Sequence, residues 1–203
     1  MVEYPRCRLT SWREIEALAD RIAESVRRGG GAPDTLVGLT RGGWVPARLL
    51  ADRLGIKRLH ALRAQHWGVT ATPTGKAELT ESLAVSLEGT SVLVVDDITD
   101  TGESLELATE HVRARGPQHL ESAALLHIGH SRFVPTHRGE EIPRENWVWV
   151  VFPWNYWEDL RTLAQRSLPE GRTPAGVQQL LAERCRWIAP LADVERALAS
   201  GGP

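Results

Sequence analysis

The chain has 203 residues, of which 42% are hydrophobic and 25% charged, and its formal net charge at pH 7 is −2. A chain of this length buries one substantial core, so we expect one domain with a small appendage and not two large domains. The near-neutral charge gives no general electrostatic reason to expect nucleic acid or a membrane surface as a partner, which leaves a small molecule as the expected ligand. No apolar run is long enough for a membrane span and no signal-peptide pattern opens the chain, so we expect a cytoplasmic protein.

Cysteine and tryptophan are the residue types whose distribution is informative. Cys7 and Cys185 lie far apart in the sequence without metal-ligand spacing, and we interpret them as reduced structural thiols. Tryptophan occurs 8 times, against 2 tyrosines and 2 phenylalanines. Four of these tryptophans fall between Trp147 and Trp157, and this cluster calls for an explanation.

The first part of the chain alternates between helical and extended patterns. Ser11 followed by Glu14 is a capping-box pattern, and the apolar spacing after it predicts a helix over 12–28, ending at a glycine run. A short apolar run predicts a strand over 35–39, and a glycine turn then leads into a predicted helix over 45–54. Alternating residues predict a strand over 58–64.

The middle of the chain continues this alternation. The polar stretch 68–80 is expected to form an exposed, mobile loop and is a candidate lid. The apolar, β-branched run 91–95 is typical of a strand buried on both faces of a parallel sheet. A helix over 103–115 and strands over 122–128 and 147–152 complete a doubly wound α/β domain with a mostly parallel sheet and flanking helices. Ligands bind such sheets beyond the carboxyl ends of the strands.

The pattern changes after residue 157. Helices are predicted at 173–185 and 191–199, with Thr173 as N-cap and Pro174 at the first helical position. Residues 158–203 carry six arginines against six acidic residues, so we interpret them as packing or subunit interface and not as a DNA-reading element. We therefore divide the chain into a domain with a small hood over 1–157 and a helical appendage over 158–203.

Residues 94–104 combine the end of a buried strand, two aspartates, a glycine turn and the start of a helix. Backbone N–H groups at a helix N-terminus favour a phosphate, and Gly102 allows the backbone to approach it closely. Asp96 and Asp97 can accept hydrogen bonds from ribose hydroxyls and hold hydrated magnesium.

This segment resembles the signature of the type I phosphoribosyltransferases, with Ser104 where that family usually has threonine. The resemblance implies binding of 5-phosphoribosyl-1-pyrophosphate (PRPP) and of Mg²⁺, the metal being held by Asp96 and Asp97. In this segment the implied PRPP-binding residues are Asp96, Asp97, Asp100, Thr101, Gly102, Glu103 and Ser104.

Residues 38–47 resemble the pyrophosphate-binding loop of the xanthine-guanine branch of that family. The resemblance implies that Thr40, Arg41, Gly42 and Gly43 bind PRPP, that Arg41 meets the pyrophosphate, and that the Thr40–Arg41 peptide is cis.

The tryptophan-rich segment 149–154 resembles the base-binding strand and loop of the purine enzymes. The resemblance implies that an aromatic face stacks on the base, with Trp149, Val150, Phe152 and Trp154 as base-binding residues. Trp147 and Trp157 are interpreted as core residues.

Two positions depart from the family pattern. Ile128 stands where a lysine donates to the purine 6-oxo group, so either His127 or His130 takes that role or the base lacks the oxo group. We count Ile128 and His130 among the base-binding candidates. Asn155 stands where an acidic residue is expected, which weakens any expectation of 2-amino recognition.

The implied reaction is magnesium-dependent transfer of the 5-phosphoribosyl group from PRPP to a purine-like base, as in purine salvage. Asp100 matches the general base that takes the proton from purine N7, and Arg41 and Lys76 match residues that contact the pyrophosphate. We expect a homodimer or homotetramer. The alternative is a regulatory protein that binds PRPP without turnover. A nucleotide-dependent dehydrogenase is disfavoured because no G-x-G-x-x-G follows a predicted strand.

Overall fold

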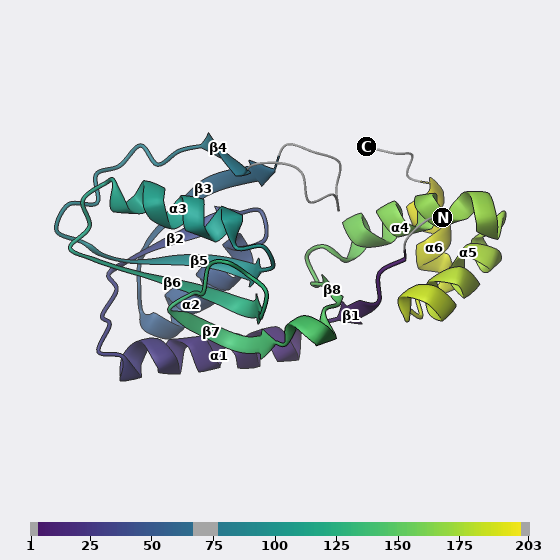
Figure 1. Ribbon diagram of the computed structural model, residues 1–203, viewed down its shortest axis with the longest axis horizontal. Helices are drawn as coiled ribbons and strands as arrows, with labels where there is room; N and C mark the ends of the chain where they lie inside the picture. Colours follow the sequence, from purple (N-terminus) through teal and green to yellow (C-terminus); the bar gives the residue numbers. More distant parts are fainter. Residues whose placement is uncertain (1–3, 67–76, 200–203) are drawn as a thin grey trace. The chain divides into compact units, whose positions relative to one another are not determined.

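A computed structural model describes residues 4–66 and 77–199 (Figure 1). The chain forms two compact units, the larger being Arg13–Trp147 and the smaller Met1–Trp12 together with Val148–Pro203. Lys76 and most of the expected loop 68–80 lie outside the described residues, while residues 77–80 are part of a strand and not of a loop.

The larger unit is built on a six-stranded sheet that is parallel except for the antiparallel pair β3·β4. This confirms the predicted doubly wound, mostly parallel α/β architecture. In spatial order the strands are β4 (Ala77–Glu81), β3 (Arg58–His66), β2 (Thr35–Thr40), β5 (Ser91–Thr99), β6 (His119–Ile128) and β7 (His137–Ile142).

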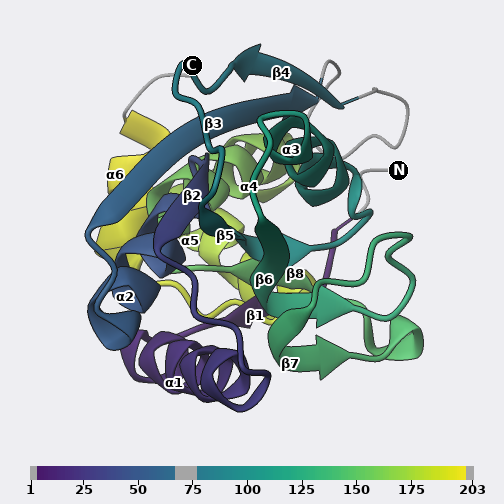
Figure 2. The same ribbon diagram turned by 90° about the vertical axis from the view of Figure 1, so that its left-hand side faces the viewer.

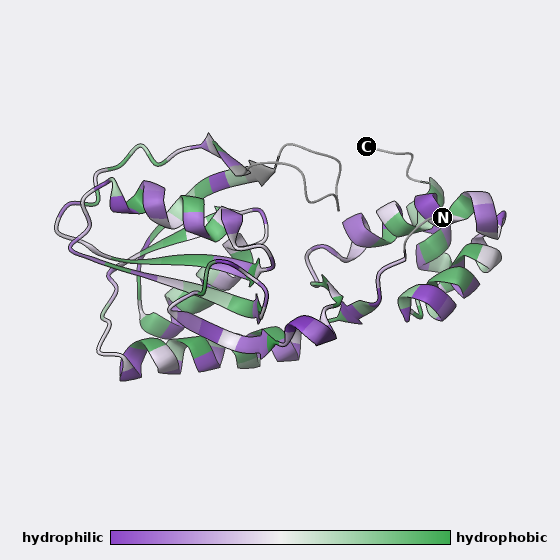
Figure 3. Ribbon diagram, viewed as in Figure 1, coloured by the Kyte–Doolittle hydropathy of each residue, from purple (hydrophilic) through white to green (hydrophobic). Residues whose placement is uncertain are grey.

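Three helices flank this sheet. They are α1 (Trp12–Arg28), α2 (Trp44–Leu54) and α3 (Glu103–Arg113). Figure 2 shows α3 on one face of the sheet and α1 and α2 on the other. Hydrophobic residues concentrate on the central strands, as Figure 3 shows, and α3 packs there through Leu105, Ala108 and Val112. The core therefore lies between the central strands and the apolar faces of the helices.

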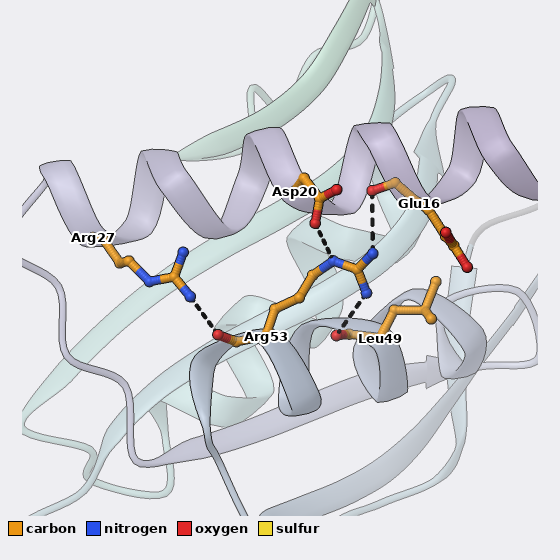
Figure 4. A network of polar contacts seen from close by, with 5 residues as sticks. All are labelled: Glu16, Asp20, Arg27, Leu49 and Arg53. Carbon is orange, nitrogen blue, oxygen red and sulfur yellow. Dashed lines mark hydrogen bonds and ion pairs between the residues drawn. The ribbon is translucent and has the colours of Figure 1, made fainter.

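A polar network centred on Arg53 joins α1 to α2 (Figure 4). The Arg53 guanidinium donates to a carboxylate oxygen of Asp20 at 2.5 Å and to the carbonyl oxygens of Glu16 and Leu49, both at 3.4 Å. Arg27 in turn donates to the carbonyl oxygen of Arg53. The predicted pyrophosphate loop joins β2 to α2. The network therefore holds in place the helix that begins at the end of this loop.

The smaller unit joins the start of the chain to its last third. A two-stranded parallel sheet pairs β1 (Cys7–Leu9) with β8 (Trp149–Val151). The helices of this unit are α4 (Tyr156–Gly171), α5 (Pro174–Leu180), the π-helical turn η2 (Leu181–Cys185) and α6 (Leu191–Ala199). Thr173 caps α5 by accepting the Gly176 N–H at 3.1 Å, as predicted. None of the described helices is long and apolar enough to cross a membrane.

The packing places the division of the chain ten residues earlier than the expected one after residue 157. Val151 packs with Leu160 and Trp187 in the core of the smaller unit, so the strand expected over 147–152 joins β1 and not the main sheet. The sequence did not predict α4 or the strands β1, β4 and β7.

Candidate active site

The loops after β2 and β5 meet at the point where the strand order of the sheet reverses. Chain order runs from β2 outward to β3 on one side and from β5 outward to β6 and β7 on the other, so β2 and β5 flank the switch point. A crevice beyond the carboxyl ends of the strands at this point is where doubly wound sheets bind ligands. The sequence-predicted residues of these two loops are thus brought to one place.

Two glycines allow the loops to touch. A Cβ added at Gly43 would lie 2.5 Å from the Val95 carbonyl oxygen and 2.8 Å from the Asp96 Cα, and one added at Gly42 would clash with the Asp97 carboxylate. Any side chain here would push the β2 loop away from β5. The Thr40–Arg41 peptide is cis, as the family resemblance implied.

Asp96 and Asp97 form a buried carboxylate pair within β5. The Asp97 N–H donates to Oδ1 of Asp96 at 2.9 Å. Burial raises the pKa of Asp96 well above its ordinary value, and repulsion from Asp97 raises it further. Two adjacent carboxylates removed from water favour a cation or hydroxyl donors as their ligand.

The turn after β5 requires glycine at position 102 for two reasons. Gly102 has φ of 85°, in the left-handed region, and α3 begins at the next residue. A Cβ there would lie 2.5 Å from Oγ of Ser131 and 2.8 Å from Cβ of Phe133. The Thr101 hydroxyl accepts the Glu103 N–H at 3.4 Å, so it caps part of the first turn of α3. The turn at Gly102 thus leads into a helix N-terminus of the kind that binds anions.

Arg132, which sequence reasoning missed, ties the segment after β6 to this turn. Its N–H donates to the Thr101 carbonyl oxygen at 3.1 Å. Its guanidinium pairs with Glu106 at 2.7 Å and with Glu103 at 3.5 Å. Since both glutamates lie in the first turn of α3, Arg132 offsets negative charge that would oppose an anion there.

One carboxylate oxygen of Asp100 is in contact with two aromatic ring nitrogens. Oδ1 lies 2.9 Å from Nε2 of His130 and accepts from Nε1 of Trp147 at 3.1 Å. The Asp100 side chain is 42% exposed. Trp147 is 38% exposed and Trp157 is 37% exposed, so the interpretation of these two residues as core is wrong. In the sequence, Trp147 stands out only as a member of the tryptophan cluster, which gave no information about its contact with Asp100.

The end of β6 corrects one base-binding assignment and excludes another candidate. Ile128 is 0% exposed and pairs in register with Ile142, so it offers no surface to a base. His127 is buried, Nδ1 of its ring lies 2.8 Å from Oγ1 of Thr99, and burial lowers its pKa. Neither residue replaces the expected lysine, and of the three candidates only His130 reaches the site.

The remaining base-binding candidates belong to the smaller unit. Val150 and Phe152 are buried, and Phe152 stacks on Trp154 with ring centroids 4.8 Å apart and planes 7° apart. The Trp12 ring lies 5.9 Å from that of Trp154, with the two planes 55° apart. The base-binding role of Trp149, Val150, Phe152 and Trp154 stays a prediction.

Known proteins resemble this chain in sequence and in fold. A curated xanthine-guanine phosphoribosyltransferase of Cereibacter sphaeroides is 29% identical over 153 residues, which are 71% of this chain and 84% of that protein. The solved purine phosphoribosyltransferase of Pyrococcus horikoshii is 27% identical with a TM-score of 0.63, covering 73% of this chain and 93% of that one. A xanthine-guanine-hypoxanthine phosphoribosyltransferase of Helicobacter pylori shares the fold at 22% identity, with a TM-score of 0.61 over 77% of this chain and 99% of that one.

The family model described as the phosphoribosyl transferase domain matches residues 7–164. This match includes both loops at the switch point and the carboxylate pair. The chain belongs to the phosphoribosyl transferase domain family.

Proposed function

We propose that this protein transfers the 5-phosphoribosyl group from PRPP to a ring nitrogen of a purine-like base, forming a nucleoside monophosphate and pyrophosphate in purine salvage. The observation that carries the proposal is the meeting of the loop 40–43, the pair Asp96–Asp97 and the turn 100–104 at the switch point of the sheet. The relatives named as xanthine-guanine and purine phosphoribosyltransferases support the choice of acceptor.

Each part of PRPP has a chemically matched partner in this arrangement. The 5-phosphate would bind the N–H groups of the turn 101–104 and the hydroxyl of Ser104, because helix N-termini favour anions. The ribose hydroxyls would donate to Asp96 and Asp97. The pyrophosphate would bind the loop 40–43, with Arg41 supplying positive charge.

The carboxylate pair also fits Mg²⁺. Magnesium prefers oxygen ligands, and it usually binds through one or two carboxylates, waters and the phosphates of a substrate. Asp96 and Asp97 supply such a pair, and the repulsion that raises the pKa of Asp96 would be relieved by a cation. Among residues 4–66 and 77–199 no cluster of three or more ligating side chains competes for a metal. When bound, the ion would offset the charge of the pyrophosphate as it departs.

Asp100 would act as the general base. Transfer at the anomeric carbon proceeds with inversion through a transition state of oxocarbenium character, so positioning and charge stabilisation dominate. The carboxylate takes the proton from the acceptor nitrogen as the new N–C bond forms and the C–O bond to pyrophosphate breaks. The exposed indole of Trp147 beside Asp100 supplies an aromatic surface next to this proton transfer, which suits a planar heterocycle as acceptor.

A panel of bases tests the proposal. Labelled PRPP is incubated with the protein and with guanine, xanthine, hypoxanthine, adenine or uracil, with Mg²⁺ or with a chelator, and labelled nucleotide is quantified. The proposal predicts nucleotide from at least one purine, none from uracil, and loss of product with the chelator. PRPP binding without nucleotide from any base would instead support a regulatory PRPP-binding protein.

A further inference from the structure

Asp100 is held in an unusual way for a partly exposed carboxylate. Both of the side-chain contacts that the described residues make with it end on Oδ1, which lies 2.9 Å from Nε2 of His130 and accepts the indole N–H of Trp147 at 3.1 Å. Among the residues that the structure describes, none donates to Oδ2. Within the described part of the chain, one oxygen is therefore held by two side chains and the other by none.

Neither hydrogen-bond donor is a loose surface side chain. His130 lies in a turn closed by the bonds Ser131 N–H to Ile128 O, 2.9 Å, and Gly129 N–H to Ile142 O, 2.8 Å. Trp147 ends the 3₁₀ turn η1 (Arg144–Asn146), and its N–H donates to the Arg144 carbonyl oxygen at 3.2 Å. Two separate segments of the larger unit thus converge on one oxygen atom.

A contribution to the stability of the fold does not explain why two side chains converge on Oδ1 of Asp100. A carboxylate with access to water does not need protein donors, and contacts between exposed charged groups contribute little to stability. Two aromatic N–H groups on one oxygen instead restrict the rotation of the carboxylate. In a proton transfer, a misplacement of about 1 Å can reduce the rate on the order of 100-fold.

We infer that His130 and Trp147 are positioning residues, which hold Oδ1 of Asp100 so that Oδ2 faces the acceptor and receives its proton. The inference rests on the proposed function, since it assigns these residues to the same proton transfer. The proton leaves the acceptor nitrogen for Oδ2, while His130 and Trp147 keep their own protons. His130 therefore acts through Asp100 and does not donate to the 6-oxo group of the base through Nε2.

Single substitutions with matched controls test the two hydrogen bonds. His130→Leu and Trp147→Phe each remove one N–H, and each should lower kcat about 10- to 100-fold while KM for PRPP stays within about twofold. His130→Gln keeps an N–H near the place of Nε2 and should restore most of the rate. Loss with Gln as complete as with Leu would contradict the assignment.

A double-mutant cycle separates positioning from direct contact with the base. If His130 acts through Asp100, then His130→Leu should have no further effect on kcat in the background of Asp100→Ala. A further loss of similar size in that background would show that His130 touches the substrate or supports the fold, and would overturn the inference.

An NMR measurement keeps this test distinct from the test of the proposed function. The Trp147 indole N–H resonance, assigned by its absence in Trp147→Phe, should shift in Asp100→Ala and in His130→Leu without any substrate present. If no base gives nucleotide with the wild type, the proposed function is wrong. If the Trp147 resonance is unshifted in both variants, the contacts of Asp100 with His130 and Trp147 are also wrong.

Discussion

Gly102 combines a left-handed backbone conformation with a close contact to the segment after β6. Gly102→Ala should destabilise the protein and weaken PRPP binding at least 10-fold, because a Cβ would meet Ser131 and Phe133 and α3 could not begin there. Gly55→Ala is the matched control, since Gly55 has φ of 71° with nothing within 4 Å of its added Cβ. The control should cost only about 1 to 2 kcal/mol of left-handed strain and leave binding intact. Thermal unfolding and calorimetric titration measure both effects, and equal effects on binding would contradict the placement of the turn.

Asp96 should destabilise the ligand-free protein. Its folded-state pKa is raised, so above the ordinary pKa of about 3.8 the unfolded chain ionises more readily and unfolding is favoured. Asp96→Asn should therefore raise the melting temperature at pH 7, with the gain vanishing below the unfolded pKa, and abolish Mg²⁺-dependent PRPP binding.

Asp34 is the control for Asp96, because its pKa is shifted in the opposite direction. A hydrogen bond from the Thr35 hydroxyl lowers its pKa, so its ionised form favours folding above the unfolded pKa and this contribution is lost as pH falls through the folded pKa. Asp34→Asn should slightly lower the melting temperature at pH 7. If Asp96→Asn also lowers it, the carboxylate pair is not the source of strain in the ligand-free site.

Residue roles were only partly accessible from sequence. The pair Asp96–Asp97 and Gly102 were found because a strand, two acids and a glycine turn are adjacent in the chain. Trp147 and Arg132 were not, because their contacts to Asp100 and to α3 depend on how distant segments fold back.

At the scale of elements, the first turn of α3 depends on charge from another segment. Arg132→Gln should remove the positive charge beside Glu103 and Glu106 and weaken PRPP binding about 5- to 10-fold, more at low salt than at high salt. Glu106→Gln added to this variant should recover part of the affinity. Titrations at two salt concentrations measure the effect, and an unchanged affinity in Arg132→Gln would show that charge at this helix end does not matter.

Ile128, at the end of β6, was counted among the base-binding candidates but is buried, and substitutions there test this correction. Ile128→Lys should not tune base specificity but should destabilise the fold by about 3 to 5 kcal/mol, as an uncompensated buried charge does. Ile128→Val should cost only about 0.5 to 1.5 kcal/mol. Urea unfolding compares the two, and a fully stable lysine variant with altered base preference would mean that residue 128 faces the base.

Elements with several agreeing local signals were predicted, whereas some elements with a single signal or none were missed. The helix α1 begins and ends as predicted because a capping pattern, an unbroken apolar stripe and a glycine run agree. The strand β7 was missed because its sequence HRGEEI is polar, and as an edge strand it buries little beyond His137 and Ile142. The helix α4 was missed although Leu160, Leu163 and Ala164 have helical spacing.

At the scale of the whole molecule, both the doubly wound sheet and the place of its site followed from the alternation of strands and helices. The division of the chain into two units did not follow from this alternation. Cys7 and Cys185 are free thiols, as interpreted, and Cys7 packs against the core cluster of the smaller unit to which Cys185 belongs. This contact brings the start of the chain to its last helices, and no local pattern reports an approach between residues so distant in sequence.

Single-turnover transfer tests the proposed reaction most directly. The protein is mixed in excess over labelled PRPP with Mg²⁺ and guanine, xanthine or hypoxanthine, and intact PRPP, nucleotide and pyrophosphate are followed in time. We predict that the label passes into nucleotide with one pyrophosphate released per nucleotide formed. In Asp100→Asn the rate should fall 100-fold or more while PRPP binding changes little. Label that stays in bound, intact PRPP with every purine base would contradict the assignment of this protein as a transferase of the purine branch.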